Sequence, residues 1–284
     1  MENEIKFKNK SIQVIKDTTY IAHIYMDNFN QRIELLKFSG DSDKLSKRLI
    51  SLCIEENLSK IICILTDKQK NCFLKKGFIV EASINGYFKG DTAFYISYFG
   101  NRIRSISKNT IEEDKILQNA LNKEGVYSHM DKGFNIRSAT KKDSKTLAHI
   151  FKEIFITYPT EMNNPEYIEY IIEKNYIFKV ASINGEIVSI ASANMNEELL
   201  NAEITDCITL PEYRGKGLLS DLIYNLELDL REKKFTALYS IARALSTGMN
   251  IVLKKHDFKY KGRLINNCNI MGQLEDMNLW VKQL

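Results

Sequence analysis

The chain has 284 residues, enough for two domains of ordinary size or for one large domain. Hydrophobic residues make up 44% of it and charged residues 27%, the composition of a soluble globular protein. The net charge of +4, from 40 basic and 36 acidic residues, is too evenly balanced to favour nucleic acid or an anionic membrane as a partner.

Cysteine and histidine usage bears on disulfides, metals and location. The five cysteines lie far apart and form no Cys-x-x-Cys pair, so we expect buried thiols in a reducing cytoplasm. The four histidines have no metal-ligand spacing, and no metal site is expected. The first residues contain no apolar core of signal-peptide length, and no later run approaches a membrane span. We therefore expect a cytoplasmic protein with no membrane partner.

The first part of the chain alternates predicted strands and helices. The helix near residue 45 carries apolar residues at helical spacing, with Asp41 or Ser42 as its N-cap candidate. Residues 101–130 are polar with one weak helical stripe, so we interpret them as a connector, and we place a domain boundary at 130. Strands are expected at 11–17, 20–26, 60–66, 78–84 and 92–99, and helices at 41–57 and 67–77.

The second part, residues 131–284, has the same alternating character. The Asn184-Gly185 pair predicts a hairpin turn, and the helix at 218–234 carries an apolar face (Leu219, Leu222, Ile223, Leu226, Leu230). Helices are expected at 144–155, 165–175, 218–234 and 246–256, and strands at 134–138, 176–195 (as the hairpin), 202–210, 235–243, 258–267 and 277–284.

Two short stretches resemble each other. "CFLKKGFIVEAS" at 72–83 and "IVLKKHDFKYKG" at 251–262 each run from a helix end into a strand. The order of elements around them also agrees, which suggests that the two parts of the chain share an architecture.

The stretch "LPEYRGKGLLSDL" at 210–222 joins a predicted strand to a predicted helix. Gly215 and Gly217 let the backbone approach an anion, and Arg214 and Lys216 add positive charge at the start of the helix. The stretch matches neither a P-loop nor a complete Gly-x-Gly-x-x-Gly fingerprint. Taken alone, it is either a phosphate cradle or a simple turn.

The order strand, hairpin, strand, "RGKG" loop and helix resembles the GCN5-related N-acetyltransferase (GNAT) superfamily over residues 131–284. Its motif, Arg/Gln-x-x-Gly-x-Gly/Ala, is matched at Arg214 and Gly217, whereas Leu219 stands where a small residue is usual. The resemblance implies an α/β (α+β) fold, with a mixed, mostly antiparallel sheet flanked by helices. It also implies acetyl-CoA as co-substrate, bound by Cys207, Ile208, Thr209, Arg214, Gly215, Lys216, Gly217, Leu218, Leu219 and Ser220.

A narrower resemblance covers most of the chain. "AEITDCITLPEYRGKGL", "YSIARALSTGMN", "NNCNI" and, in the first part, "FLKKGFIVEASINGYFKGD" are similar to β-lysine N-acetyltransferases. That resemblance implies acetylation of the ε-amine of β-lysine to N6-acetyl-β-lysine, a compatible solute, by direct transfer.

Amine acetylation needs a base, because a lysine ε-amine is mostly protonated near neutrality. Glu203 is the first candidate, since histone-type members of the superfamily use a glutamate at this strand position. Asp206 has the opposite parity in a regular strand, and a bulge could exchange the two roles. Cys207 is expected to be a buried small hydrophobe, not a nucleophile. Leu253 stands where many members of the superfamily have a tyrosine that acts as the general acid. Tyr260 or water would therefore protonate the leaving thiolate.

The acceptor would carry a carboxylate and two amines. Arg243 is the expected carboxylate partner because its guanidinium suits bidentate pairing, with pairing to a local acid as the alternative. Asn250 and Asn267 would supply neutral hydrogen-bonding groups, and Tyr158 and Glu161 could face the amines, or all of these could be ordinary packing residues.

The first part of the chain has the element order of a half acetyltransferase fold but lacks the glycine loop. We expect a degenerate GNAT-like domain that completes the acceptor pocket or contacts a second copy in a homodimer. Acetylation of another diamine, of lysine or of a protein amine stays open at this point, as does a coenzyme A-binding module without turnover.

Overall fold

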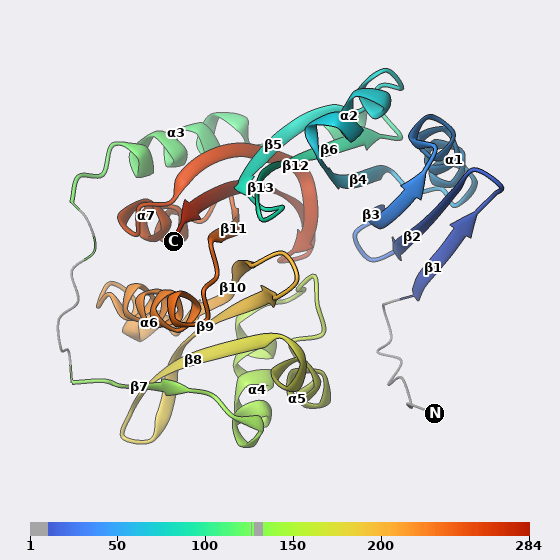
Figure 1. Ribbon diagram of the computed structural model, residues 1–284. Coiled ribbons are helices and arrows are strands. Elements are labelled where there is room, and N and C mark those ends of the chain that lie inside the picture. Colours follow the sequence, from blue (N-terminus) through green and yellow to red (C-terminus); the bar gives the residue numbers. More distant parts are fainter. Residues whose placement is uncertain (1–10, 126, 128–132) are drawn as a thin grey trace, which may run out of the picture.

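The computed structural model describes residues 11–125, 127 and 133–284. A single sheet passes through this part of the chain, with thirteen strands in the order β1-β2-β3-β4-β6-β5-β12-β13-β11-β10-β9-β8-β7. The strands are mostly antiparallel, and helices cover the sheet, so the expected α+β class is confirmed (Figure 1).

The first half of the sheet is built from residues 11–99. Its elements are β1 (Ser11–Lys16), β2 (Tyr20–Asp27), β3 (Arg32–Gly40), α1 (Ser42–Glu55), β4 (Lys60–Leu65), α2 (Asp67–Leu74), β5 (Ile79–Gly86) and β6 (Gly90–Phe99). The 3-10 turn η1 (Ile103–Ser105) and the helix α3 (Thr110–Leu121) follow.

The second half begins after residue 133. Its elements are β7 (Asn135–Ser138), η2 (Lys141–Asp143), α4 (Ser144–Ile154), α5 (Pro165–Lys174), β8 (Tyr176–Ile183), β9 (Glu186–Asn196), β10 (Asn201–Thr209), η3 (Pro211–Tyr213), α6 (Leu218–Glu232), β11 (Ala237–Arg243), α7 (Thr247–Lys255), β12 (Lys259–Ile270) and β13 (Gln273–Gln283).

The two halves share one topology. The order β2-β3-β4-β6-β5 matches β9-β10-β11-β13-β12, and each half has its parallel pair at the same place, β3 with β4 and β10 with β11. The two similar stretches of sequence fall on equivalent elements, α2 into β5 and α7 into β12. The first half therefore repeats the strand order of the second half, and its description as a GNAT-like domain stays a prediction.

The halves join where β5 and β12 pair at Gly262 and Ala82. Gly262 has φ +144°, and a Cβ there would lie 2.2 Å from the carbonyl oxygen of Glu81. Only glycine permits this approach of the two backbones, so one residue allows the sheet to continue from half to half.

Two helices show why the local patterns predicted the fold well. In α1 the expected stripe is buried, and Asp41 caps the helix by accepting from the amides of Asp43 and Lys44. In α6 the residues Leu222, Ile223, Leu226 and Leu230 are fully buried, but Leu218 completes the face, while Leu219 is only partly buried. The hairpin turn at Asn184-Gly185 is also confirmed, with positive φ at both residues.

One strand was missed by the sequence analysis. β3 lies between the predicted strand at 20–26 and helix α1. Its sequence, RIELLKFSG, places Leu35 and Leu36 side by side, and Leu36 is 49% exposed, so a period of two is hard to see. Pairing with β2 and β4 decides its conformation.

The connector is helical in part and is anchored on β12. Arg263 of β12 pairs with Glu113 at 3.4 Å and Asp114 at 2.8 Å, both on α3, and the Asn266 amide donates to two backbone carbonyls near η1. The boundary near residue 130 falls at 128–132, outside the described residues, and stays a prediction. Among the described helices, none has the length and apolar character needed to cross a membrane.

Candidate active site

The parallel strands β10 and β11 separate partway along their length. Their pairing is limited to Asn201–Ala237, Ala202–Leu238 and Glu203–Tyr239, although both strands continue beyond it. The Ser240 hydroxyl donates to the carbonyl of Ile204 at 2.8 Å, at the point where the strands part. The opening is therefore a property of the sheet itself.

A cleft of about 790 Å³ occupies this opening. Its walls are the second part of β10, the glycine loop, the start of α6, the end of β11 and one face of α7. Apolar side chains such as Ile208, Leu218, Met249 and Met277 line much of it. A long, flexible, amide-bearing chain suits such a slot, because it needs both apolar contact and exposed strand edges.

The glycine loop closes one end of the cleft. Gly215 and Gly217 have φ of +78° and +77°, in the left-handed region that favours glycine. Gly217 is the N-cap of α6 and has no side chain to accept from the first-turn amides, which lack intrahelical acceptors. Arg214 Nε donates to the carbonyl of Thr209 at 3.1 Å, and the Lys216 ammonium lies over the Tyr213 ring. The loop suits an anion at the positive end of the helix.

The cofactor-binding residues expected from the sequence come together here. Cys207, Ile208 and Thr209 line the cleft from β10, and residues 214, 215 and 217–220 line it from the loop and helix. Lys216 is absent from the lining, since its ammonium lies over Tyr213. Burial raises the pKa of the Cys207 thiol, which donates to the carbonyl of Thr205. Such a thiol stays protonated and is a poor nucleophile.

A β-bulge interrupts β10 between Thr205 and Ile208. Asp206 has φ +51° at this bulge, and its side chain lines the cleft. Its carboxylate accepts from Tyr158 Oη at 3.0 Å and from Ser192 Oγ at 2.7 Å. Parity alone would have placed Asp206 on the face opposite Glu203, so the bulge changes which side chains the strand offers.

Glu203 lies just before the bulge, at the last parallel pair. Burial, and then the nearby carboxylates of Asp206 and Glu34, raise its pKa to about 8, against the opposing effect of Arg32. A carboxylate with such a pKa is a stronger base than an ordinary glutamate, and in its deprotonated form, increasingly populated as the pH rises towards 8, it can accept a proton. Glu203 itself does not line the cleft, which reaches β10 from Ile204 onward. Its role as base stays a prediction.

Arg243 lines the cleft and also has a local partner. Its guanidinium pairs with Glu275 of β13, Nη2 to Oε1 at 3.1 Å and Nε to Oε2 at 3.4 Å. Asn250 lies beneath it, fully buried, donating to the carbonyls of Arg243 and Ser246. The oxygen of Asn250 accepts from Asn278 and Trp280. Asn250 therefore positions this end of β11 instead of facing a ligand.

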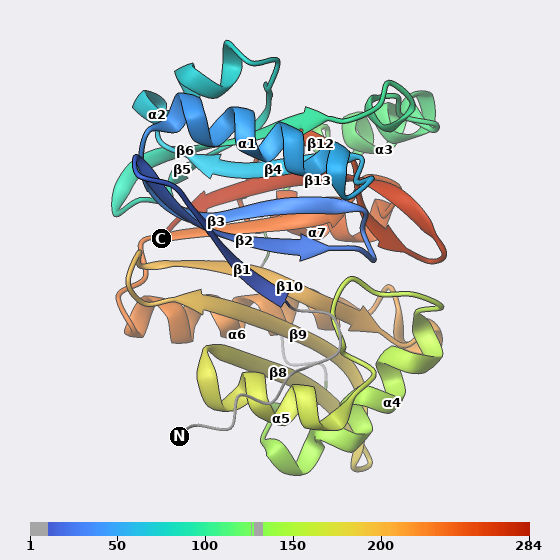
Figure 2. The same ribbon diagram turned by 90° about the vertical axis from the view of Figure 1, so that its right-hand side faces the viewer.

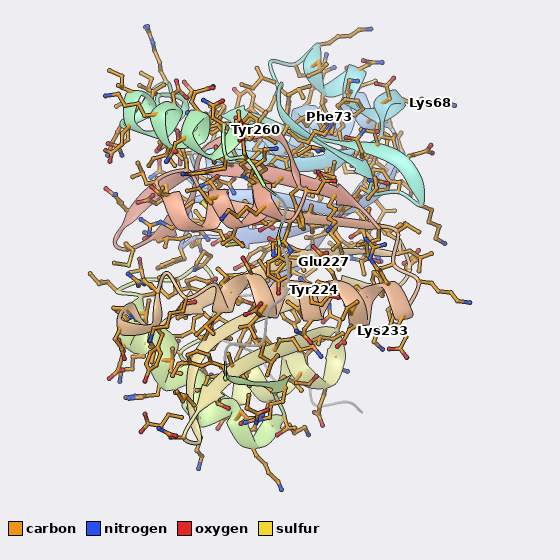
Figure 3. All side chains as sticks on the ribbon, turned by 90° about the vertical axis from the view of Figure 1, so that its left-hand side faces the viewer. Lys68, Phe73, Tyr224, Glu227, Lys233 and Tyr260 are labelled. Atoms are coloured by element: carbon orange, nitrogen blue, oxygen red, sulfur yellow. The ribbon has the colours of Figure 1, made fainter. Side chains whose placement is uncertain are left out.

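Two further predicted residues lie away from the cleft. Tyr260 packs edge-on against Trp280, on the side of the molecule where α3 lies (Figure 3), and does not line the cleft. Asn267 is buried where β12 meets the first half, and its carbonyl accepts from Arg32 Nη1 at 2.8 Å. Tyr158 and Tyr213 are the tyrosines among the described cleft residues. The sequence offered no sign of the Tyr158–Asp206 contact, because it joins residues 48 positions apart.

Comparison with known proteins agrees with this geometry. The acetyltransferase (GNAT) family matches at residues 145–250. The β-lysine N(6)-acetyltransferase of Methanococcus maripaludis is 34% identical over 91% of this chain and 95% of its own length. The enzyme of the same name from Methanosarcina mazei is 31% identical over 88% of this chain and 100% of its own.

N-acetyltransferase YodP of Bacillus subtilis is 35% identical over 96% of this chain and 100% of its own length. These relatives match both halves of the molecule and not the cleft-bearing half alone. With the splayed strands, the glycine loop and the family match, the chain belongs to the GNAT family and is an N-acetyltransferase that uses acetyl-CoA.

Proposed function

We propose that this acetyltransferase acetylates the ε-amine of β-lysine and so makes N6-acetyl-β-lysine, a compatible solute. The observation that carries the proposal is the similarity, along nearly the whole chain, to two β-lysine N(6)-acetyltransferases from different organisms. Both matches extend over the first half, which lies outside the cofactor cleft, and so support a shared acceptor as well as a shared donor.

Acetyl-CoA supplies an acetyl group activated as a thioester. The amides at the start of α6, with Arg214 beside them, would hold its pyrophosphate. The splay between β10 and β11 would take the rest of the cofactor, against Ile208, Leu218 and Met249. The strand edge beyond the bulge at Asp206 has lost its parallel partner, so its backbone groups can orient the cofactor chain.

The acceptor amine must lose a proton to become a nucleophile. Glu203, with its pKa raised to about 8, would take that proton directly or through water. Asp206 is the second candidate, since it lines the cleft and its hydrogen bonds from Tyr158 and Ser192 fix its carboxylate. Burial and the adjacent Asp206 hold the pKa of Tyr158 well above its usual range, so Tyr158 stays protonated and can act as a donor.

The acceptor is tested by thiol release from acetyl-CoA with purified protein and a panel of amines: β-lysine, lysine, ornithine and spermidine. We expect the highest kcat/KM with β-lysine and a product acetylated at N6 by mass spectrometry. A higher kcat/KM with another small amine would show that this amine, and not β-lysine, is the acceptor. Turnover of a lysine-containing peptide in place of every small amine would show instead that the acceptor is a protein.

A further inference from the structure

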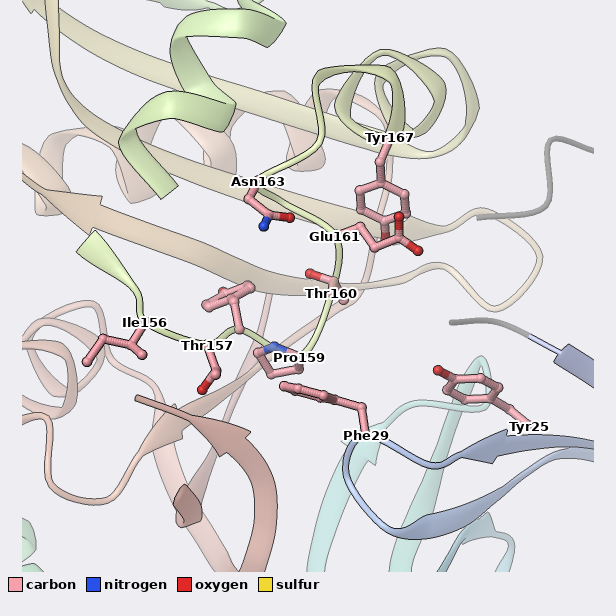
Figure 4. A pocket seen from close by; sticks show the side chains of 10 residues that line it. Tyr25, Phe29, Ile156, Thr157, Pro159, Thr160, Glu161, Asn163 and Tyr167 are labelled. Atoms are coloured by element: carbon pink, nitrogen blue, oxygen red, sulfur yellow. The ribbon is translucent and has the colours of Figure 1, made fainter. Parts of the chain in front are cut away.

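A second pocket, of about 220 Å³, lies between the two halves of the molecule. Tyr25 of β2 and Phe29 of the β2–β3 turn line it from the first half. Residues 156–161 and 163, and Tyr167 of α5, line it from the second half. In Figure 4 the Glu161 carboxylate and the Tyr167 ring point into the space that Tyr25 reaches from the other side, and Phe29 lies near Pro159.

A single residue of β12 holds both walls of this pocket. The amide of Asn269 donates to Asn30 Oδ1 in the β2–β3 turn at 2.6 Å. Its side-chain oxygen accepts from Thr157 Oγ1 at 2.9 Å, and that hydroxyl in turn accepts from the amide of Gly272 at 2.7 Å. The pocket is thus a fixed feature of the contact between the halves.

The pocket and the cofactor cleft meet at Tyr158. This side chain lines both, and its hydroxyl donates to Asp206 at the bulge. Tyr158 therefore connects an acceptor in the pocket with Asp206, which lines the cleft that would hold the donor. This is the arrangement that direct transfer between two substrates requires.

The charges around the pocket favour a cation. Glu161 lines it, and Glu34 stands opposite Tyr25 in the β2–β3 register. Arg32 is a nearby cation, and it already pairs with Asp27 at 3.0 Å and with Glu34. Burial, and then Asp27 and Glu34, raise the pKa of Tyr25. Aromatic faces beside carboxylates are a suitable environment for an ammonium group.

We propose that this pocket binds the ammonium group of the acceptor that is not acetylated, with Glu161 pairing with it and the rings of Tyr25 and Phe29 packing against it. The half fold without a cofactor cleft would then select diamines. This inference rests on the proposed function, because it requires a small acceptor with a second amine.

Kinetics of Glu161→Gln with two acceptors test the inference. β-Lysine has the second amine, whereas 6-aminohexanoate has the terminal amine and the carboxylate alone. We expect KM for β-lysine to rise about tenfold, the loss of one ion pair of about 1.4 kcal/mol. KM for acetyl-CoA and kcat/KM for 6-aminohexanoate should stay within about twofold of the parent protein. Phe29→Ala should raise KM for β-lysine about threefold and should likewise leave kcat/KM for 6-aminohexanoate nearly unchanged.

Glu186→Gln and Ile54→Ala are the matched controls, because both residues are exposed and neither lines the pocket. An equal effect of Glu161→Gln on both acceptors, or no effect, would overturn the inference. If β-lysine is not turned over but another diamine is, the proposed acceptor fails, and the same comparison is made with that diamine and its mono-amine analogue. If no amine is turned over, calorimetry of β-lysine binding to the coenzyme A complex decides, and undetectable binding to the parent protein would overturn the inference.

Discussion

The two halves of this molecule have the same order of strands but differ where the first parallel strand meets its helix. In the second half, eight residues (210–217) separate β10 from α6, and the N-cap is Gly217. In the first half, β3 ends at Gly40, Asp41 alone intervenes, and α1 begins at Ser42. The Asp41 carboxylate accepts hydrogen bonds from two amides in the first turn of α1. In the first half, the carboxylate of Asp41 therefore lies at the helix N-terminus, the place that in the second half is open to an anionic ligand.

The space beyond this junction also differs. In the first half, Phe73 of α2 packs between Phe38 and Phe78 in the hydrophobic core, with ring centroids 6.1 and 5.2 Å away. Figure 2 shows α1 and α2 lying over the strands of this half. In the second half, the equivalent helix α7 contributes Met249 and Val252 to the wall of the open cleft. The comparison teaches that topology alone does not make a cofactor site. Loop length, the capping residue and the size of a few side chains do.

The largest effect is expected at Glu203, the last residue of β10 that pairs with β11. Glu203→Gln should lower kcat about 100-fold or more, because the amide cannot accept the proton. In the parent protein the rate should rise with pH through about 8, as Glu203 deprotonates, and the variant should lose this inflection. Steady-state kinetics between pH 6 and 9.5 measure both. Unchanged kcat, or a larger loss in Asp206→Asn, would move the base to Asp206.

Glu34→Gln is the matched change in the first half. It should leave kcat within about threefold, since Glu34 lies in the half without a cofactor cleft. The Glu34 carboxylate raises the pKa of Glu203, so its removal should shift the inflection of the rate profile to lower pH. A shift to higher pH would contradict the electrostatic link between the halves.

A smaller effect is expected when the first-half cap is transferred to the second half. Gly217→Asp puts a carboxylate at the N-cap of α6, in a backbone conformation that aspartate tolerates. Coenzyme A should bind about 100-fold more weakly by calorimetry, because the new charge competes for the same amides. Gly217→Asn, the uncharged control, should cost no more than about tenfold. Equal losses in both variants would show that shape and not charge decides binding.

The smallest effect concerns the ion pair at the mouth of the cleft, which has no counterpart where β4 runs directly into α2. Arg243→Ala leaves Glu275 buried, with Gln273 as a remaining donor, and should reduce the free energy of unfolding by about 2 kcal/mol. Adding Glu275→Gln should recover at least half of that loss in urea denaturation. If the double variant is stable but its KM for the acceptor stays high, Arg243 also holds the acceptor carboxylate.

Local patterns in the sequence were sufficient to predict most elements and the glycine loop that lines the cleft. The apolar stripes of α1 and α6, the cap at Asp41, the turn at Asn184-Gly185 and the glycine loop each depend on neighbours within one or two turns of chain. Their backbone preferences therefore act before any distant contact forms. The resemblance of these stretches to the GNAT superfamily predicted the activity, N-acetylation with acetyl-CoA.

Tertiary structure alone decided the rest. β3 becomes a strand because β2 and β4 pair with it, and its own pattern does not predict this. The bulge turns Asp206 into the cleft, whereas strict alternation would have placed it on the face opposite Glu203. The pocket between the halves needs Asn269 to reach both Asn30 and Thr157, contacts that span 239 and 112 residues. Such contacts depend on how the strands of the whole sheet are arranged, which no local window of sequence contains.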